Sequence, residues 1–367
     1  MKFRAAVLEK VGAPLVIDTL EMAALQPGDV LVRLHASGLC HTDLEVFQGS
    51  LIYPLPIVLG HEGAGVVEAV GSAVTQVKKG DHVVCSWNPH CGLCFYCERQ
   101  QPILCEPFTR HQPRGLLLDG TTRMSRDGET VYHYSVTSTH AEYTVVPESG
   151  AIAVPKELPF DRACIIGCGV MTGIGAVVRK ARVDAGAYVA VIGCGAVGLN
   201  AIQGARLADA GRIIALDMDT DKLARAKAFG ATDTLDASAP DVADRVRALT
   251  GTRGADYVFE CAGHKSAFRL SVELARPGGQ IVWLGKVNVN EEVGFRWGSL
   301  MGEKRIVRSS YGDAVPRRDF PWIAHEYLEG RVMLDELITA RIPMEDINEG
   351  FATLARGEGI RTVMEMA

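Results

Sequence analysis

The chain lacks several features that mark common classes of protein. It has no run of about 18 apolar residues, the length that predicts a membrane-spanning helix. Its first residues lack the apolar stretch and small-residue cleavage site of a signal peptide. Its 38 basic and 44 acidic residues leave a net charge of only −6, so it has no overall positive field for nucleic acid or anionic membranes. These absences predict a cytoplasmic protein with neither nucleic-acid nor membrane partners.

The composition is otherwise that of an ordinary globular protein. Hydrophobic residues make up 47% and charged residues 22% of the 367 positions, and at about 150 residues per domain the length suggests two domains. Glycine, with 39 residues, is enriched over its usual ~7%, which indicates tight turns or close approaches of backbone to a ligand. Ten cysteines are too few for a disulfide scaffold, and in a reducing compartment clustered thiols more often hold metal.

The pattern of secondary structure changes part of the way along the chain. Up to about residue 159, short valine-rich segments between glycines and prolines predict an irregular, mostly antiparallel β domain, with a hairpin turn at Asp127-Gly128. From about residue 172, strands and helices alternate, which predicts an α/β domain with a doubly wound parallel sheet. The expected strands are 188–192, 212–217, 256–261 and 280–284, and the expected helices are 195–210, 219–229, 241–249 and 265–275. Amphipathic helices follow from about residue 320, with a last strand at 361–366.

Four cysteines are closely spaced in the first half of the chain: Cys91, Cys94, Cys97 and Cys105. Thiolates at this spacing can close a tetrahedron around one zinc ion. Coincidence or an iron–sulfur cluster is the alternative. Because four protein ligands leave no open position, such a zinc would hold a loop together and would do no chemistry.

Three further residues could hold a metal, although their spacing cannot join them. Cys40, His61 and Cys168 each lie in a glycine-flanked turn, and 21 and 107 residues separate them. For any one of them alone, a small buried side chain is the simpler interpretation. If they converge, two thiolates and one imidazole leave a position open on zinc, which is the arrangement of a catalytic site.

A glycine-rich motif follows the first strand of the α/β region. Gly193, Gly195 and Gly198 match G-x-G-x-x-G, and Asp217 ends the next strand 19 residues after Gly198. In this context the motif predicts a dinucleotide site with the pyrophosphate at the N-terminus of the helix. Asp217 would accept hydrogen bonds from a ribose diol and repel a 2′-phosphate, so the motif favours NAD over NADP. An ordinary βα turn is the alternative.

These three signals, in this order, resemble the zinc-dependent medium-chain alcohol dehydrogenases. The resemblance runs from about residue 5 to residue 366 and includes the stretches YTVV, DKLARAKAFGATD, INEGF and IRTV. It implies a GroES-like catalytic domain at 1–168 and 311–367, interrupted by a Rossmann NAD-binding domain at 169–310. It also implies a homodimer or homotetramer with two zinc ions per subunit. The catalytic zinc would be held by Cys40, His61 and Cys168, and the structural zinc by the four clustered cysteines.

The resemblance also assigns roles beside the catalytic zinc. Thr42 matches the hydroxyl that takes the proton of the alcohol, Asp43 matches the carboxylate that orients the histidine ligand, and Glu62 lies beside the metal. Many members end the proton relay with a histidine, where this chain has Glu45. The residues that match coenzyme contacts are His41, Thr172, Val197, Lys222 and Arg361. The residues that match the substrate channel are Leu51, Trp87, Tyr134 and Ser135.

The predicted activity is reversible oxidation of alcohols to aldehydes by hydride transfer to NAD. An aromatic, largely apolar pocket would suit a hydrophobic primary alcohol better than a polyol, although a polyol dehydrogenase of the same superfamily stays an alternative. A formaldehyde dehydrogenase that uses a thiol adduct is another: those relatives carry acidic residues in the loop where this chain has SLIYPLP, but Arg110 lies within a residue of their anion-binding arginine. A non-catalytic NADPH-binding protein is a third, disfavoured because the zinc ligands, Thr42 and Asp217 are all present.

Overall fold

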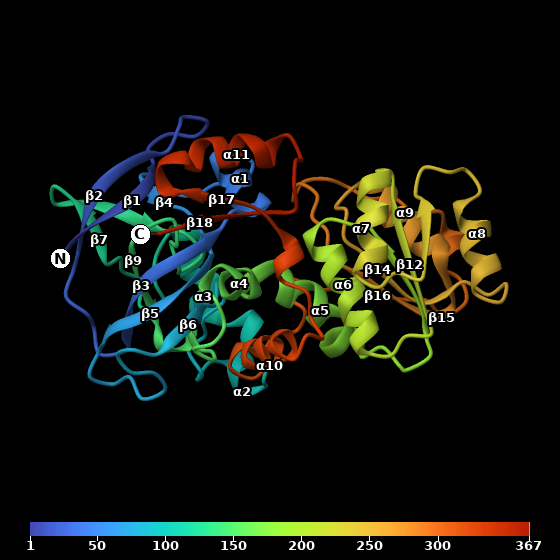
Figure 1. Ribbon diagram of the computed structural model, residues 1–367, viewed down its shortest axis with the longest axis horizontal. Coiled ribbons are helices and arrows are strands. Elements are labelled where there is room, and N and C mark those ends of the chain that lie inside the picture. The colour runs from blue at the N-terminus through green and yellow to red at the C-terminus, as the bar shows by residue number, and fades with distance from the viewer. Residues whose placement is uncertain (367) are drawn as a thin grey trace. The chain divides into compact units, whose positions relative to one another are not determined.

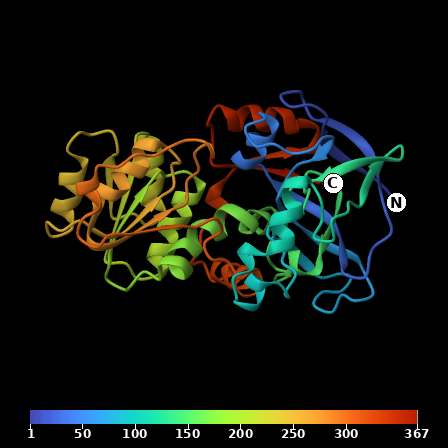
Figure 2. The same ribbon diagram turned by 180° about the vertical axis from the view of Figure 1, so that it is seen from behind.

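A computed structural model describes residues 1–366. The chain groups into two compact units. The first consists of Met1–Cys168 and the chain from Val315 onward, and the second of Gly169–Ala314. The first unit therefore contains sequence from both ends of the chain, blue to green and red in Figures 1 and 2, and the second is one continuous stretch.

The second unit is built on a six-stranded sheet in which every pair of neighbours is parallel, in the order β13-β12-β11-β14-β15-β16. Helices connect the strands and pack against the sheet (Figure 1). This confirms the predicted α/β doubly wound fold. The strands are β11 (Tyr188–Ile192), β12 (Arg212–Asp217), β13 (Asp233–Asp236), β14 (Ala255–Glu260), β15 (Ala275–Trp283) and β16 (Arg305–Arg308). The helices are α5 (Met171–Gly175), α6 (Ala196–Leu207), α7 (Thr220–Ala228), α8 (Val242–Leu249) and α9 (Lys265–Leu274).

The strand order creates a switch point at the centre of this sheet. The chain runs outward from β11 to β12 and β13, and then returns to β14 on the other side of β11. Because crossovers between parallel strands are right-handed, helices before and after the return cover opposite faces. In such sheets ligands bind beyond the carboxyl ends of the two strands at the switch point. Here Gly193 follows β11 and Cys261 follows β14, so the glycine-rich motif lies at that edge.

The first unit combines a closed barrel, β1-β2-β7-β8-β4, with a seven-stranded sheet, β10-β6-β5-β3-β18-β17, on which β9 pairs with β3. Within residues 1–366, β4–β8 and β17–β18 are the parallel pairs of this unit, and the rest are antiparallel. The predicted, mostly antiparallel β architecture is therefore confirmed. The strands are β1 (Lys2–Leu8), β2 (Val16–Met22), β3 (Asp29–Gly38), β4 (Ile57–Val58), β5 (Glu62–Val70), β6 (His82–Cys85), β7 (Met124–Arg126), β8 (Glu129–His133), β9 (Tyr143–Pro147), β10 (Ala151–Ala153), β17 (Ile338–Pro343) and β18 (Arg361–Glu365). The helices are α1 (His41–Phe47), α2 (Phe95–Glu98), α3 (Glu106–His111), α4 (Phe160–Ile165), α10 (Pro316–Leu328) and α11 (Ile347–Ala355).

The hairpin predicted at Asp127-Gly128 is confirmed. It joins β7 to β8, with Arg126 opposite Glu129. Asp127 and Gly128 have φ angles of 51° and 84°. Positive φ at both central residues matches the twist of the flanking strands in a two-residue turn, which is why Asp-Gly predicts one.

One helical segment is long and apolar enough to be compared with a membrane-spanning helix. Phe160–Ala181 meets the criteria of length and composition for crossing a membrane, although it contains no unbroken run of about 18 apolar residues. However, 83% of its most apolar stretch is buried inside the structure, which is the pattern of a core helix in a soluble protein. The segment includes two π-helical turns, Ile166–Val170 and Ala176–Ala181. Such turns are rare and occur frequently at functional sites.

A buried histidine makes the stability of the first unit depend on pH. His133 is fully buried, and its Nε2 accepts a hydrogen bond from the backbone N–H of Arg123 at 3.3 Å. Burial, together with the charge of Arg123, lowers the pKa of His133 to about 3. The unfolded chain takes up a proton below about pH 6.5 that the folded protein does not bind. His133 should therefore contribute a fall of about 1.4 kcal/mol per pH unit to the free energy of unfolding as the pH drops below 6.5.

This prediction is measured by urea unfolding between about pH 7 and pH 5. The matched variant is His133→Gln, whose amide oxygen can still accept the bond from Arg123 but does not titrate. Its stability should fall less steeply with pH, by the slope of one proton. Parallel curves for the two proteins would contradict the assignment.

Candidate functional site

The structure brings the three dispersed residues together in the first unit. Cys40 precedes α1, His61 precedes β5, and Cys168 lies in the π-helical turn Ile166–Val170. One ligand atom from each of Cys40, His61, Glu62 and Cys168 lies within 4.8 Å of the others. Nε2 of His61 is 3.3 Å from Sγ of Cys168. Folding therefore joins residues that are 21 and 107 positions apart.

Asp43 orients the imidazole of His61 in this cluster. Its carboxylate is fully buried and lies 2.9 Å from Nδ1 of His61. It also accepts hydrogen bonds from the backbone N–H groups of Cys40, at 3.0 Å, and Gly60, at 3.2 Å. When Nδ1 donates to a carboxylate, the lone pair of Nε2 is free to face a metal. Burial alone would lower the pKa of His61, but Asp43 and Cys40 raise it well above its usual value.

Glu62 and Arg361 form a buried pair beside the cluster. Nη2 of Arg361 is 3.4 Å from Oε1 of Glu62, and both side chains are almost completely inaccessible. Among the residues that the structure describes, neither carboxylate oxygen of Glu62 has a hydrogen-bond partner. Burial raises the pKa of Glu62 to about 7, against the opposing charge of Arg361. The expected contact of Arg361 with pyrophosphate stays a prediction.

The donor set of this cluster fits zinc. Two sulfurs and an imidazole are the ligands that zinc prefers, and a carboxylate is a further zinc ligand. A hydrogen bond from Cys168 lowers the pKa of Cys40 well below its usual value, which favours a thiolate. The carboxylate of Glu62, which is paired with Arg361 but accepts no hydrogen bond among the described residues, is the kind of buried group that a second nearby cation would stabilise.

The four clustered cysteines also converge. One sulfur from each lies within 4.8 Å of the others, and Sγ of Cys94 is 3.5 Å from Sγ of Cys97. The backbone N–H of Glu106 donates to Sγ of Cys94 at 3.5 Å, and this bond lowers the pKa of Cys94 to about 6. Four thiol groups in one place match a closed structural zinc site.

The predicted relay residues lie on α1, next to the cluster. Oγ1 of Thr42 is 3.8 Å from Sγ of Cys40. Glu45 is half-buried one turn further along, and His41 is exposed at the first position of the helix. The helix therefore holds Thr42 close to the candidate metal ligands, while the end of the relay stays a prediction.

Of the predicted substrate residues, Tyr134 lies closest to the cluster. Its ring packs edge-on against His61, with centroids 5.7 Å apart, and its hydroxyl donates to the backbone carbonyl of Thr42 at 3.2 Å. Leu51 packs in the same core cluster as Tyr134, and Ser135 is buried beside it. Trp87 instead packs toward Phe108, with centroids 6.3 Å apart.

Sequence reasoning missed Tyr53, which packs in the same core cluster as Leu51 and Tyr134. Its ring is edge-on to Tyr134 at 5.0 Å, and its hydroxyl accepts a hydrogen bond from the side chain of Gln112. The signal was available, because Tyr53 lies two positions after Leu51 in the loop that was compared with formaldehyde dehydrogenases.

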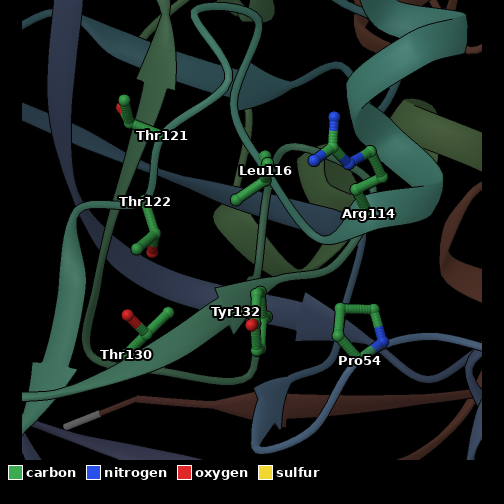
Figure 3. A pocket seen from close by; sticks show the side chains of 7 residues that line it. All are labelled: Pro54, Arg114, Leu116, Thr121, Thr122, Thr130 and Tyr132. Carbon is green, nitrogen blue, oxygen red and sulfur yellow. The ribbon is translucent and has the colours of Figure 1, made fainter.

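A surface hollow of about 650 Å³ lies elsewhere in the first unit (Figure 3). It contains none of the predicted substrate residues and no member of the metal clusters. It therefore has no part in the chemistry derived below. Its lining residues are Pro54, Arg114, Leu116, Thr121, Thr122, Thr130 and Tyr132.

In the second unit, the glycine motif forms the turn between β11 and α6. Gly193 has a φ angle of 90°, in the left-handed region that favours glycine. A Cβ atom on Gly198 would lie 1.8 Å from the carbonyl oxygen of Gly193, so no side chain fits there. Gly195 is the N-cap residue of α6. This geometry leaves the helix N-terminus open to an anion.

Asp217 closes this turn from the end of β12. Its carboxylate accepts the backbone N–H of Cys194 at 2.7 Å and that of Asp219 at 3.0 Å. Val197 is half-buried in the first turn of α6 and Lys222 is half-buried on α7. Thr172 lies on α5, where a Cβ on the next residue, Gly173, would be 2.4 Å from the carbonyl oxygen of Val197. The structure thus brings Thr172 close to Val197.

Comparison with known proteins gives a consistent result. Residues 26–156 match the alcohol dehydrogenase GroES-like domain, and residues 196–329 match the zinc-binding dehydrogenase family. An S-(hydroxymethyl)glutathione dehydrogenase of Synechocystis is 39% identical over 99% of this chain and 100% of that protein. A class-3 alcohol dehydrogenase of Cereibacter sphaeroides is 40% identical over the same shares. The benzyl alcohol dehydrogenase structure of Acinetobacter calcoaceticus has a TM-score of 0.94 at 29% identity, over 100% of both chains.

The chain therefore belongs to the zinc-dependent alcohol dehydrogenases of the medium-chain dehydrogenase family. It is an oxidoreductase whose cofactors are NAD and zinc. The resemblance drawn from the sequence, the GroES-like and Rossmann folds, and the class of enzyme are all confirmed.

Proposed function

We propose that this enzyme reversibly oxidises hydrophobic or aromatic primary alcohols to aldehydes with NAD. The observation that carries the proposal is the apolar character of the loop before His61. Residues 50–56 contain no acidic or basic side chain, and Ile52 in this loop is 85% exposed. Tyr134 places an aromatic ring beside His61, and Tyr53 packs against Tyr134. Similarity to a benzyl alcohol dehydrogenase supports the same substrate class.

In this proposal residues 1–168 and 311–367 form the catalytic domain. Cys40, His61 and Cys168 hold a zinc ion, whose Lewis acidity polarises an alcohol or carbonyl oxygen. Asp43 keeps His61 in the tautomer and direction needed for binding. The hydroxyl of Thr42 accepts the proton of the substrate hydroxyl, and the proton then passes to Glu45 or through the ribose of the coenzyme to water. Glu62, backed by Arg361, places a negative charge next to the cluster.

Residues 169–310 form the NAD-binding domain. Gly193, Gly195 and Gly198 let the pyrophosphate reach the N-terminus of α6, and Asp217 accepts hydrogen bonds from the ribose diol. The hydride transfer itself is chemistry of the coenzyme, and the protein supplies position and charge. Thr172 and Val197 support the nicotinamide. His41 and Arg361 bind the pyrophosphate, and Lys222 contacts the adenosine ribose.

Neutralising Asp217 should reduce the preference for NAD. Asp217→Asn keeps an acceptor for the turn, but it weakens the bond to the ribose diol and no longer repels a 2′-phosphate. Hydrogen bonds to charged groups contribute about 2 kcal/mol, so kcat/KM for NAD should fall roughly 30-fold while that for NADP rises. Initial rates with both coenzymes measure the change. Asp219→Asn, at an exposed position two residues along whose carboxylate caps α7, is the control. An unchanged ratio in Asp217→Asn would contradict the assignment.

The substrate proposal is tested by reduced-nicotinamide absorbance with NAD and a small panel. The panel contains ethanol, hexanol, benzyl alcohol, cinnamyl alcohol and sorbitol. Hexanol and the two aromatic alcohols should react with much higher kcat/KM than ethanol. Preference for sorbitol would instead indicate a polyol dehydrogenase, and silence from zinc-loaded protein would contradict the apolar pocket.

A thiol-adduct formaldehyde dehydrogenase is the second candidate. It is favoured by the names of the curated relatives, such as the S-(hydroxymethyl)glutathione dehydrogenases of Synechocystis and Paracoccus denitrificans, both 39% identical over 99% of this chain. The loop at residues 50–56 disfavours this candidate, because the loop has no carboxylate that could bind a peptide-like thiol. Addition of glutathione to a formaldehyde assay separates the two: a large increase in rate would establish this candidate.

The chain is also proposed to act in the cytoplasm as a homodimer or homotetramer. In the described residues β16 pairs only with β15, so one edge of the six-stranded sheet stays open. Trp297 and Met301, just before this strand, are 79% and 66% exposed. An open edge with exposed apolar side chains is a typical pairing surface. Light scattering after size exclusion would measure the mass, and a monomer of 39.5 kDa would contradict the proposal.

A further inference from the structure

A buried, strained segment links β8 to β9 in the first unit. We define it as the strap, residues 134–140. All seven of its side chains are buried. Ser135, Val136 and Ser138 have φ angles of 49°, 59° and 52°, in the left-handed region. This is unusual for residues other than glycine, above all for β-branched valine, and such strain persists only where surrounding contacts enforce it.

The strap holds the three residues that precede His61. The Ser138 hydroxyl donates to the carbonyl of Val58 at 2.8 Å, and the backbone N–H of His140 donates to the carbonyl of Leu59 at 3.0 Å. The carbonyl of Gly60 accepts a bond from the backbone N–H of Thr139 at 3.0 Å. It also shares the hydroxyl of Thr137, at 3.1 Å, with the carbonyl of Tyr134, which lies at the same distance.

The approach of the strap to Gly60 leaves no free space. Gly60 has a φ angle of 93°, and a Cβ atom there would lie 2.6 Å from the backbone nitrogen of His140 and from Oγ1 of Thr139. The strap is itself anchored to β3, because Ser37 Oγ lies 2.7 Å from Oγ1 of Thr139 and 3.0 Å from Nδ1 of His140. The turn before His61 is therefore clamped between a strand and the strap.

Tyr134, the first residue of the strap, also contacts the backbone of Thr42. Tyr134 donates its hydroxyl to the backbone carbonyl of Thr42 and packs edge-on against the ring of His61. One short segment thus contacts both the main chain before the candidate metal ligand and the main chain of the candidate proton acceptor. These contacts join residues 77 and 92 positions apart in the sequence.

We propose that the strap is a positioning element for His61 and Thr42, and that Thr137 is its key residue. The carbonyl of Gly60 and the backbone nitrogen of His61 belong to the same planar peptide unit. A hydroxyl that holds this carbonyl therefore restricts rotation of the His61 backbone, while Asp43 restricts the ring. The strap acts through His61 and touches no reacting atom. The inference rests on the proposed role of His61 as a zinc ligand.

The test compares two substitutions of Thr137. Thr137→Val keeps the shape but removes the donor to Gly60, and Thr137→Ser keeps the donor. Loss of an outer hydrogen bond typically weakens metal binding 10- to 100-fold, and because the Thr139 N–H still holds the same carbonyl we expect about 10-fold in Thr137→Val. Competition with a chromophoric chelator should show this loss for one of the two zinc ions. kcat should fall in parallel, the KM for NAD should not change, and Thr137→Ser should restore both.

Thr122→Val is the matched control. Thr122 also donates its hydroxyl to a backbone carbonyl, that of Val131 at 2.7 Å, and it lies in the same unit but outside the strap. It should bind both zinc ions like the wild type. Ser138→Ala, which removes the bond to Val58, provides the second test if Thr137→Val does not fold, and it too should weaken one zinc site selectively.

The possible failures are distinguishable. Wild-type protein with two zinc ions, together with unchanged zinc affinity and kcat in Thr137→Val, would overturn the role of the strap alone. An equal loss of zinc affinity and kcat in Thr122→Val, or a failure of Thr137→Ser to restore them, would show that Thr137 contributes only to general stability. Either result would also overturn the role of the strap. Wild-type protein with only the four-cysteine zinc would overturn the proposed metal site, and this inference with it.

Discussion

Replacement of Cys168 by alanine will abolish alcohol oxidation and leave NADH binding nearly unchanged. The sulfur of Cys168 lies 3.3 Å from Nε2 of His61, and its removal leaves two protein ligands from the predicted three. Without the metal no group in the cluster can polarise the substrate oxygen. The residues proposed for NADH belong largely to the second unit, which the substitution does not touch.

Three measurements check this prediction. Turnover of benzyl alcohol should fall below detection, the zinc content should fall from two ions per chain to one, and a fluorescence titration should give a wild-type Kd for NADH. Cys164→Ala is the matched control, because Cys164 is a buried thiol one turn earlier that donates to the carbonyl of Asp161 and lies outside the cluster. It should retain two zinc ions and activity. Full activity in Cys168→Ala would disprove the ligand assignment.

The central strands of the sheet in the second unit could be predicted from the sequence, and the two edge strands could not. β11 and β12 were predicted to the residue, because strands buried on both faces are short apolar runs. β13, with the sequence DTLD, and β16, with RIVR, were missed. Both are four-residue strands at the edges of the sheet, where less burial removes the apolar signal.

Helix ends show a different limit. The predicted helix 195–210 ends in the structure at Leu207, because Asp209 takes a left-handed φ of 53°. Helix-forming residues continue through this point, so composition gave no stop signal. The π-helical turn that contains Cys168 was equally invisible, because it depends on how the long segment Phe160–Ala181 packs and not on any local residue preference.

The sequence alone predicts only one of the two metal clusters. The four clustered cysteines are close in sequence, so chelate geometry predicts their convergence directly. Cys40, His61 and Cys168 were joined only by resemblance to a family, and the structure supplies the contacts that join them. Tyr53 and the positioning contacts of the strap were missed because these contacts cross more than 50 residues of sequence, as in the bonds from Gln112 to Tyr53 and from Tyr134 to Thr42.

Replacement of Cys94 by serine should remove the second zinc and unfold the segment around the four cysteines. Residues 91–104 include no fully buried side chain, whereas Cys105 and Phe108, which follow them, pack in the core of the first unit. α2 has only four residues, far below the length at which a helix is stable alone. Leu93 and Phe95 are 83% and 52% exposed, so little apolar surface is buried there. Because binding of a structural zinc is itself folding free energy, its loss should cost about 4 kcal/mol of stability.

The measurements are zinc content, the midpoint of thermal unfolding and limited proteolysis. Cys94→Ser should contain one zinc ion, unfold at a lower temperature and be cleaved within residues 91–111. Leu93→Ser is the control, because it places the same side chain on the neighbouring exposed position and should keep both zinc ions. If Cys94→Ser retained two zinc ions and the wild-type midpoint, the four sulfurs would be a cluster of thiols and not a structural metal site. The expected outcome, a loss of stability with the Cys40–His61–Cys168 zinc still present, would show that the two metals act independently, one in folding and one in chemistry.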